Sequence, residues 1–208
     1  MTTWIACALA YLLGGIPFAL VIVRALAGVD VRTIGSGNVG ATNAARAFTG
    51  KTKIAVFVLI YVLDFTKGFV PTAWFATWFA AGTLGNAAPV VFGACAIVGH
   101  VLTPFLHFKG GKGVATSCGV VAALDWVALV AALLVFLLVF LGTKKVFLGS
   151  LALGLTLPVV AILQAPGTAF GARLPVTVFC FAIAALLFWT HRSNIRKALA
   201  SARAGGAA

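Results

Sequence analysis

Hydrophobic positions along this 208-residue chain form seven long runs separated by short polar segments. The runs cover residues 4–27, 54–81, 89–108, 114–124, 127–141, 146–163 and 176–190. A helix of about 20 apolar residues is long enough to cross a hydrocarbon layer of about 30 Å. The pattern therefore predicts an all-α polytopic membrane protein with about seven transmembrane helices, forming one domain over residues 1–208.

Two features qualify this prediction. Runs 114–124 and 127–141 are short for full spans, so we expect one of them to be tilted or to cover only part of the bilayer. The sequence GGIP at 14–17 predicts a kink or a site of tight packing inside the first run. Composition agrees with the membrane class, because 62% of the residues are hydrophobic and only 9% are charged.

Basic residues are distributed unevenly between the connections. All but two of the 15 Lys and Arg residues, Lys67 and Arg173, lie in connections that would share one side of the membrane. The positive-inside rule places these connections in the cytoplasm, the N-terminus outside and the C-terminus in the cytoplasm. Orientation and contact with anionic lipid heads account for most of these charges, and nothing in them requires nucleic acid.

The longest polar interruption is the glycine-rich stretch GSGNVGATNAAR at 35–46. Its glycines let the backbone adopt positive φ and approach a ligand closely, and its amides can form a concavity for an anion. Small donors and acceptors and one forked cation accompany them, namely Ser36, Asn38, Thr42, Asn43 and Arg46. The stretch predicts an anion site, although an ordinary polar loop between two membrane helices fits it as well.

A second stretch, KGGKG at 109–113, places two lysines in a glycine-rich turn just before Thr116 and Ser117. Paired ammonium groups on a flexible backbone suit a phosphate. The spacing differs from that of a P-loop, since Lys112 is followed by Gly113. With no acidic residue nearby to hold Mg²⁺, nucleotide hydrolysis is not indicated.

The third stretch is HRSNIR at 191–196. If the helix continues, His191 and Asn194 lie three residues apart on one face. Histidine can exchange a proton near neutral pH and asparagine can orient a hydroxyl. A basic helix end that reaches toward lipid heads is the alternative interpretation.

Other polar residues fall within the apolar runs. Asp64 and Lys67 are spaced to pair with one another, yet an intramembrane charge is also a functional candidate. His100 could cap a kink or point into a cavity, and Ser150 could face a cavity or bond back to its own helix. The four cysteines lie in apolar runs without metal-type spacing, and we interpret them as packing residues.

Together, these motifs resemble the bacterial acyl-phosphate:glycerol-3-phosphate acyltransferase family of the PlsY type. The sequences GSGNVGATN (35–43), KGGKGVAT (109–116) and HRSNIR (191–196) occur in this order between apolar runs, and DFTKG (64–68) and Gly99-His100 match as well. The family usually carries an aromatic residue where this chain has Thr103, and the residues before Ser150 match only loosely.

The resemblance implies transfer of a fatty acyl group from acyl phosphate to the sn-1 hydroxyl of glycerol 3-phosphate. The products would be 1-acyl-glycerol 3-phosphate (lysophosphatidic acid) and phosphate, in phospholipid biosynthesis. It implies a multi-pass protein of the bacterial inner membrane with a cytoplasmic active site, no cofactor and no metal. The partners are the two substrates and membrane lipids, and a monomer is the working expectation.

The implied catalytic residues are Ser36, Lys109, His191 and Asn194. The lysines would bind phosphate and stabilise charge on the leaving group, and His191 and Asn194 would position glycerol 3-phosphate. Either His191 or a phosphate oxygen of the donor would take the hydroxyl proton. The implied substrate-binding residues are Gly37, Asn38, Gly40, Thr42, Asn43, Arg46, Lys67, Gly110, Gly111, Lys112, Thr116 and Ser150.

Two rival functions remain at this stage. Glycine-interrupted helices and the Asp64/Lys67 pair would suit a small transporter or channel for an anionic solute. The motifs, however, gather toward one face of the membrane and no internal repeat is evident. A non-catalytic membrane scaffold would leave three polar glycine-rich stretches unexplained.

Overall fold

The computed structural model describes residues 2–79 and 82–205, and every regular element in these ranges is a helix. The chain divides into two compact units, residues 1–124 and 125–208. Unit 1 contains α1 (Thr2–Gly15), α2 (Phe18–Ala27), η1 (Val31–Thr33), α3 (Ala41–Ala44), η2 (Ala45–Ala47), α4 (Gly50–Trp78), η3 (Gly82–Ala87), α5 (Ala88–Val101), η4 (Pro104–Leu106) and α6 (Val114–Leu124). Unit 2 contains α7 (Trp126–Thr143), α8 (Val146–Leu163), α9 (Leu174–Thr190) and α10 (Arg192–Gly205).

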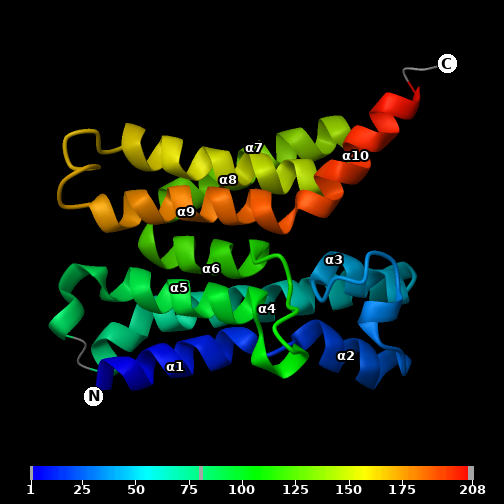
Figure 1. The fold of residues 1–208 in the computed structure, drawn as a ribbon, viewed down its shortest axis with the longest axis horizontal. Coiled ribbons are helices and arrows are strands. Elements are labelled where there is room, and N and C mark those ends of the chain that lie inside the picture. Colours follow the sequence, from blue (N-terminus) through cyan, green and yellow to red (C-terminus); the bar gives the residue numbers. More distant parts are fainter. Residues whose placement is uncertain (1, 80–81, 206–208) are drawn as a thin grey trace. The chain divides into compact units, whose positions relative to one another are not determined.

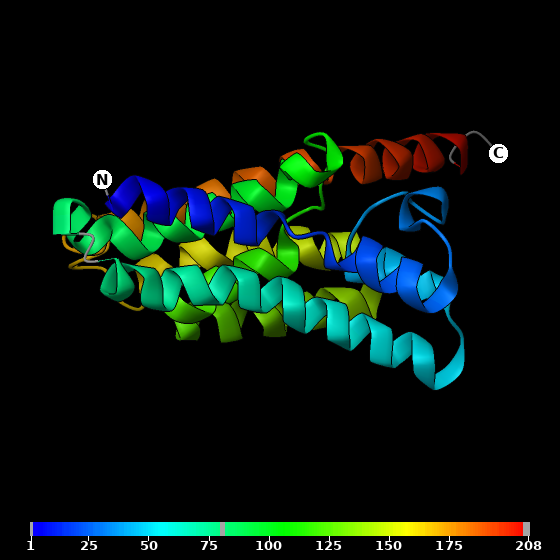
Figure 2. The ribbon, with the colours of Figure 1, turned by 90° about the horizontal axis from the view of Figure 1, so that it is seen from below.

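Unit 1 is built around the long helix α4, which α1 and α2 follow along its length (Figures 1 and 2). Glycines allow its helices to pack closely. A Cβ atom at Gly14 or Gly99 would collide with the backbone of α5 or α1, and one at Gly68 or Gly119 with that of α6 or α4. Small residues at such contacts are typical of helix packing in membranes.

The first apolar run is broken into two helices at the predicted kink. Pro17 has no backbone N–H, and the Leu20 amide, which would bond to Ile16 O in a continuous helix, donates to Pro17 O instead (3.0 Å). Hence α1 ends at Gly15 and α2 begins at Phe18.

Unit 2 is a bundle in which α8 packs against both α7 and α9. Its loop end is held by Asp125, whose carboxylate caps α7 by accepting from the Ala128 amide (3.0 Å) and also pairs with Arg173 and Gln164. At the other end α9 and α10 meet at a bend of 55°. Many large apolar side chains of α7, such as Leu134 and Leu138, are exposed, as expected for a surface that faces lipid.

Each predicted apolar run contains helix, and the limits of 114–124 and 146–163 agree with α6 and α8. The run 89–108 extends beyond α5, which ends at Val101, and the last two residues of the run 54–81 lie outside the described residues. Within the described residues, five helical segments are long and apolar enough to cross a membrane, with α1 and α2 together counting as one of them. The number is six if the bent pair of α9 and α10 forms one span. Helix α6 has only 11 residues, or about 17 Å, and is the short run that the sequence anticipated. The all-helical membrane class is confirmed. The count of seven spans is not, because α6 is too short, and the orientation stays a prediction.

Candidate active site

The glycine-rich stretch 35–46 folds into a compact loop organised by one side chain. The Asn43 amide is buried, accepts from the Ser36 amide (2.9 Å) and donates to Val31 O (2.9 Å) and Ile34 O (3.0 Å). Gly35 and Gly37 adopt the positive φ angles that the sequence suggested, 51° and 71°. Asn43 was predicted to bind substrate, but its polar atoms are used inside the loop.

The other polar side chains of this stretch lie on its surface. Ser36, Thr42 and Arg46 are exposed and Asn38 is half-buried. Arg46 folds back across Gly35, where a Cβ atom would come within 2.6 Å of Arg46 Nη1. The apolar residues of the loop pack in the opposite direction, in a cluster with residues of α2, α4 and η4: Val39, Ala41 and Ala44. The loop thus presents donors and one cation outward on a fixed apolar base.

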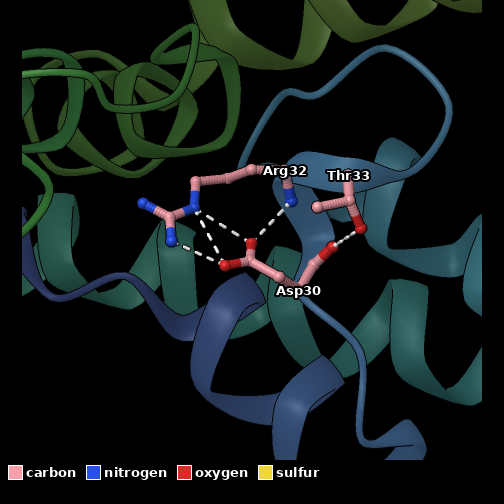
Figure 3. Close-up of polar contacts among 3 residues, drawn as sticks. All are labelled: Asp30, Arg32 and Thr33. Atoms are coloured by element: carbon pink, nitrogen blue, oxygen red, sulfur yellow. Dashed lines mark hydrogen bonds and ion pairs between the residues drawn. The ribbon is translucent and has the colours of Figure 1, made fainter.

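An ion pair marks the start of this loop (Figure 3). Asp30 accepts from the Arg32 amide (2.9 Å) and binds the Arg32 guanidinium (2.6 Å from Oδ2 to Nη2), and the Thr33 hydroxyl donates to Asp30 O. These hydrogen bonds from Arg32 lower the pKa of Asp30 to about 2. Asp30 thus caps η1, and an aspartate directly before a short helix is the sequence signal for such a cap.

The lysine stretch lies on the end of α5. Gly110 donates to Val101 O (2.9 Å) and Gly111 to His100 O (3.0 Å). There is no room for a side chain at either glycine, since a Cβ atom would meet His100 O or the His100 ring. Lys109 is exposed and Lys112 is half-buried, immediately before α6 begins.

Thr116 and Ser117 lie deeper than their sequence position suggests. Both are fully buried, and neither hydroxyl has a hydrogen-bond partner in the part of the chain described. The Thr116 backbone and methyl group pack on Gly68 of α4. The predicted substrate contact of Thr116 therefore finds no support from exposure, because the residue occupies a close helix contact.

A small pocket joins the two loops within unit 1. It is lined by Gly15, Ile16, Pro17, Val39, Lys67, His100, Thr103 and Gly111. Its free space for the centre of a water molecule is about 10 Å³, which is room for about one water. Val39 comes from the glycine-rich stretch and Gly111 from the lysine stretch, so folding brings these two motifs together.

Lys67 lines the pocket but does not extend to the surface. It is 3% exposed, and its Nζ lies 2.8 Å from Asp64 Oδ1 and donates to Ile16 O at 2.9 Å. The ion pair suggested by the spacing is present. The predicted substrate contact of Lys67 finds no support, since its ammonium is directed at protein groups.

The remaining predicted residues belong to unit 2. The Ser150 hydroxyl donates to Val146 O (3.1 Å) in its own helix, which is the alternative that the sequence left open. His191 lies at the bend after α9 and is buried, with Nδ1 2.8 Å from Leu187 O. A carbonyl oxygen only accepts, so this contact assigns the Nδ1 proton. Asn194 follows in the first turn of α10, which begins with a bond from the Ile195 amide to His191 O.

Metal ligation has no evident place among these residues. No three His, Cys, Asp or Glu side chains gather as a metal site requires within residues 2–79 and 82–205.

Comparison with known proteins decides the family. The family described as "Glycerol-3-phosphate acyltransferase" matches residues 4–201. The chain belongs to this family. It is 42% identical over 188 residues to the glycerol-3-phosphate acyltransferase of Endomicrobium trichonymphae, covering 90% of this chain and 87% of that protein. It is 43% identical over 189 residues to the glycerol-3-phosphate acyltransferase of Anaeromyxobacter dehalogenans strain 2CP-C, covering 90% of this chain and 89% of that protein.

Solved structures agree with this assignment. The crystal structure of PlsY (YgiH), an integral membrane glycerol 3-phosphate acyltransferase, in its glycerol 3-phosphate form has a TM-score of 0.84 to this chain. The two are 35% identical, and the match covers 97% of this chain and 94% of that one. Its lysophosphatidic acid form has a TM-score of 0.81 at 34% identity, with 97% and 93% covered. The chain is therefore a multi-pass membrane protein of the acyltransferase class, as the three motifs indicated.

Proposed function

We propose that this protein transfers a fatty acyl group from acyl phosphate to the sn-1 hydroxyl of glycerol 3-phosphate. The products are lysophosphatidic acid and phosphate, at the start of phospholipid biosynthesis. The main support within the structure is that Val39 of the glycine-rich loop and Gly111 of the lysine loop line one small pocket. The loops that carry Arg46, Lys109 and Lys112 therefore lie close together, and both substrates carry phosphate. PlsY, a relative, has been crystallised in glycerol 3-phosphate and lysophosphatidic acid forms, which supports the same acceptor and product.

The proposed reaction needs few protein groups. The sn-1 oxygen attacks the acyl carbonyl carbon, the bond from that carbon to the phosphate oxygen breaks, and phosphate leaves with the electron pair. Because acyl phosphate is already activated, the step needs no coenzyme A, metal or covalent enzyme intermediate. Cations that stabilise the departing phosphate and the carbonyl oxygen supply most of what remains.

We assign roles by exposure and chemistry. Lys109 and Lys112 bind phosphate and stabilise the developing charge, and Ser36 and Arg46 bind phosphate from the facing loop. The supporting contacts come from Gly37, Asn38, Gly40, Thr42, Gly110 and Gly111. Four further residues affect the site indirectly, because their side chains are buried in their units: Asn43, Lys67, Thr116 and Ser150. His191 and Asn194 position glycerol 3-phosphate.

The hydroxyl proton has two possible acceptors. His191 carries a proton on Nδ1 toward Leu187 O, which is the tautomer a general base acting through Nε2 needs. A phosphate oxygen of the donor can act instead. If His191 is the base, the pH profile of kcat in His191→Gln loses its acidic limb. Appreciable turnover with an unchanged profile would assign the proton to the donor phosphate.

We further propose that residues 1–208 act as one acyltransferase domain in the bacterial inner membrane, with the active site on the cytoplasmic face. The family match at 4–201 includes parts of both units. The basic residues of the glycine-rich loop, the lysine loop and α10 favour the cytoplasmic side by the positive-inside rule.

A phosphate-release assay on purified protein in lipid tests the proposal. Palmitoyl phosphate and glycerol 3-phosphate are supplied together and singly, with palmitoyl-coenzyme A in parallel. We expect release only with both substrates, formation of acylated glycerol phosphate, and a loss of about 100-fold or more in Lys109→Ala. Lys145→Ala, an exposed lysine of unit 2, is the control and retains the rate.

The other outcomes of this assay are equally specific. Activity with the coenzyme A thioester alone would keep the reaction class and overturn the donor. No transfer from either donor by folded protein would favour the transporter, which uptake into liposomes then tests. Arg46→Lys keeps the charge and loses the two-pronged contact, so a near-normal rate would exclude a forked phosphate contact.

A further inference from the structure

Three buried polar side chains of unit 1 form a cluster to which the proposed chemistry assigns no contact with substrate. Asp64 and Lys67 lie in the middle of α4 and His100 lies near the end of α5, and each is 3–6% exposed. The carboxylate connects them, since Asp64 Oδ1 is 2.8 Å from Lys67 Nζ and 3.8 Å from His100 Nδ1. We name these three residues the Asp–Lys–His cluster.

Lys67 links the cluster to the break between α1 and α2. Its ammonium donates to Ile16 O, 51 residues away in the sequence, at the point where Pro17 interrupts the helix. The same ammonium lies 5.5 Å from the centre of the Phe18 ring. Ile16 O also accepts from the Phe18 amide (3.1 Å), so Lys67 is the second of two donors that hold this carbonyl at the break.

His100 links the cluster to the lysine loop. Gly111 lies so close to the imidazole that a Cβ atom would collide with Nε2, and its amide donates to His100 O. Just beyond, the Thr103 hydroxyl donates to Gly15 O (2.6 Å), a second tie between this segment and the α1–α2 break. Gly15, His100, Thr103 and Gly111 all line the pocket that joins the two loops. The buried Nδ1 atom of His100 has no hydrogen-bond partner among the described residues.

Stability alone is a weak reason for such a cluster. A buried ion pair is often no more stabilising than apolar residues of similar size, and intramembrane charges are costly. Sites that perform chemistry, by contrast, need a supporting layer that fixes the groups touching substrate.

We propose that Asp64, Lys67 and His100 are positioning residues that hold the α1–α2 break against the lysine loop, and so fix Lys109 and Lys112 for transfer. This inference rests on the proposed function for its kinetic consequence only. It predicts that neutralising the ion pair loosens the loop and lowers turnover without unfolding the protein.

The test compares two neutralised ion pairs. Asp64→Asn/Lys67→Met removes both charges and the bond to Ile16 O. Asp125→Asn/Arg173→Gln is the matched control in unit 2, at the end of α9 opposite His191.

We expect the Asp64→Asn/Lys67→Met variant to keep its thermal midpoint within about 5 °C and to lose about 10- to 100-fold in kcat. Its KM for glycerol 3-phosphate should stay within about threefold of wild type. The control should keep kcat.

A second measurement does not depend on activity. Amide hydrogen exchange over residues 102–113, which include the Gly110 and Gly111 donors, should be faster in the Asp64/Lys67 variant and unchanged in the control. His100→Asn keeps the ion pair and should show both the kcat loss and the faster exchange. It decides the question if the double variant does not fold.

Wild-type kcat together with wild-type exchange at 102–113 in the folded variants would overturn the inference. The kcat of each variant is compared with that of wild type, using the acyl donor that wild type accepts. The comparison therefore remains valid if the proposed donor is wrong. If wild type transfers from no donor, the proposed function fails while the exchange result still decides the positioning role.

Discussion

Two buried ion pairs, one in each unit, use similar groups in different surroundings. Asp64 is 3% exposed and pairs with Lys67, also 3% exposed, in the middle of a 29-residue membrane helix. Asp125 is 6% exposed and pairs with Arg173, whose side chain is 28% exposed, where the loops of unit 2 meet. Water can therefore reach the Arg173 guanidinium but not the Lys67 ammonium. We therefore expect the loss of a partner to cost more stability where solvent cannot take its place.

The largest effect should follow from breaking the first pair on one side. Lys67→Met leaves the Asp64 carboxylate in an apolar interior without its cation. We expect a loss of about 3–5 kcal/mol in the free energy of unfolding, measured by titration with a denaturing detergent. Adding Asp64→Asn should restore most of the lost free energy of unfolding. A Lys67→Met protein as stable as wild type would contradict the comparison.

Breaking the second pair should cost less. In Arg173→Gln the Asp125 carboxylate keeps the Ala128 amide and the Gln164 amide as donors, and water reaches the vacated position. We expect a loss of about 1–2 kcal/mol in the same titration. Equal losses in Lys67→Met and Arg173→Gln would show that solvent access does not set the difference.

The smallest effect concerns the surface pair Asp30–Arg32, which extends the comparison to a pair whose two side chains both reach solvent. The pKa of Asp30 is about 2 in the folded protein and 3.8 without its partners. The charged form is therefore favoured on folding, so its contribution to stability is present above about pH 4 and is lost as the pH falls through about 2. Unfolding curves of wild type and Asp30→Asn should differ slightly at pH 6, differ less at about pH 2, and converge below it. A difference at about pH 2 as large as that at pH 6 would assign the effect to another group.

Much of the molecule could be predicted because its signals are local. The length of apolar runs predicted the helices, including the limits of α6 and α8, since a helix in lipid satisfies its own backbone. Pro17 predicted the break in the first run, and Gly35 and Gly37 predicted positive φ angles. The order of three polar motifs was enough to indicate the family.

Residue roles inside those motifs depend on tertiary contacts and stay predictions. Asn43 and Thr116 have the chemistry of ligand contacts, yet one is used to fold its loop and the other fills a contact between α4 and α6. Thr103, which departs from the family's usual aromatic residue, proved to bond to Gly15 O, 88 residues away. Composition and spacing do not show whether a polar side chain faces solvent or the interior of the protein.

The sequence by itself determined the membrane class, the positions of the helices and the motifs that carry the chemistry, because each depends on neighbours within about 20 residues. Tertiary structure alone decided that Lys67 reaches Ile16 O, that His100 underlies Gly111, and that the glycine-rich and lysine loops share a pocket. These contacts join segments about 10 to 70 residues apart, and their partners are selected by helix packing, which places groups side by side irrespective of their distance along the chain.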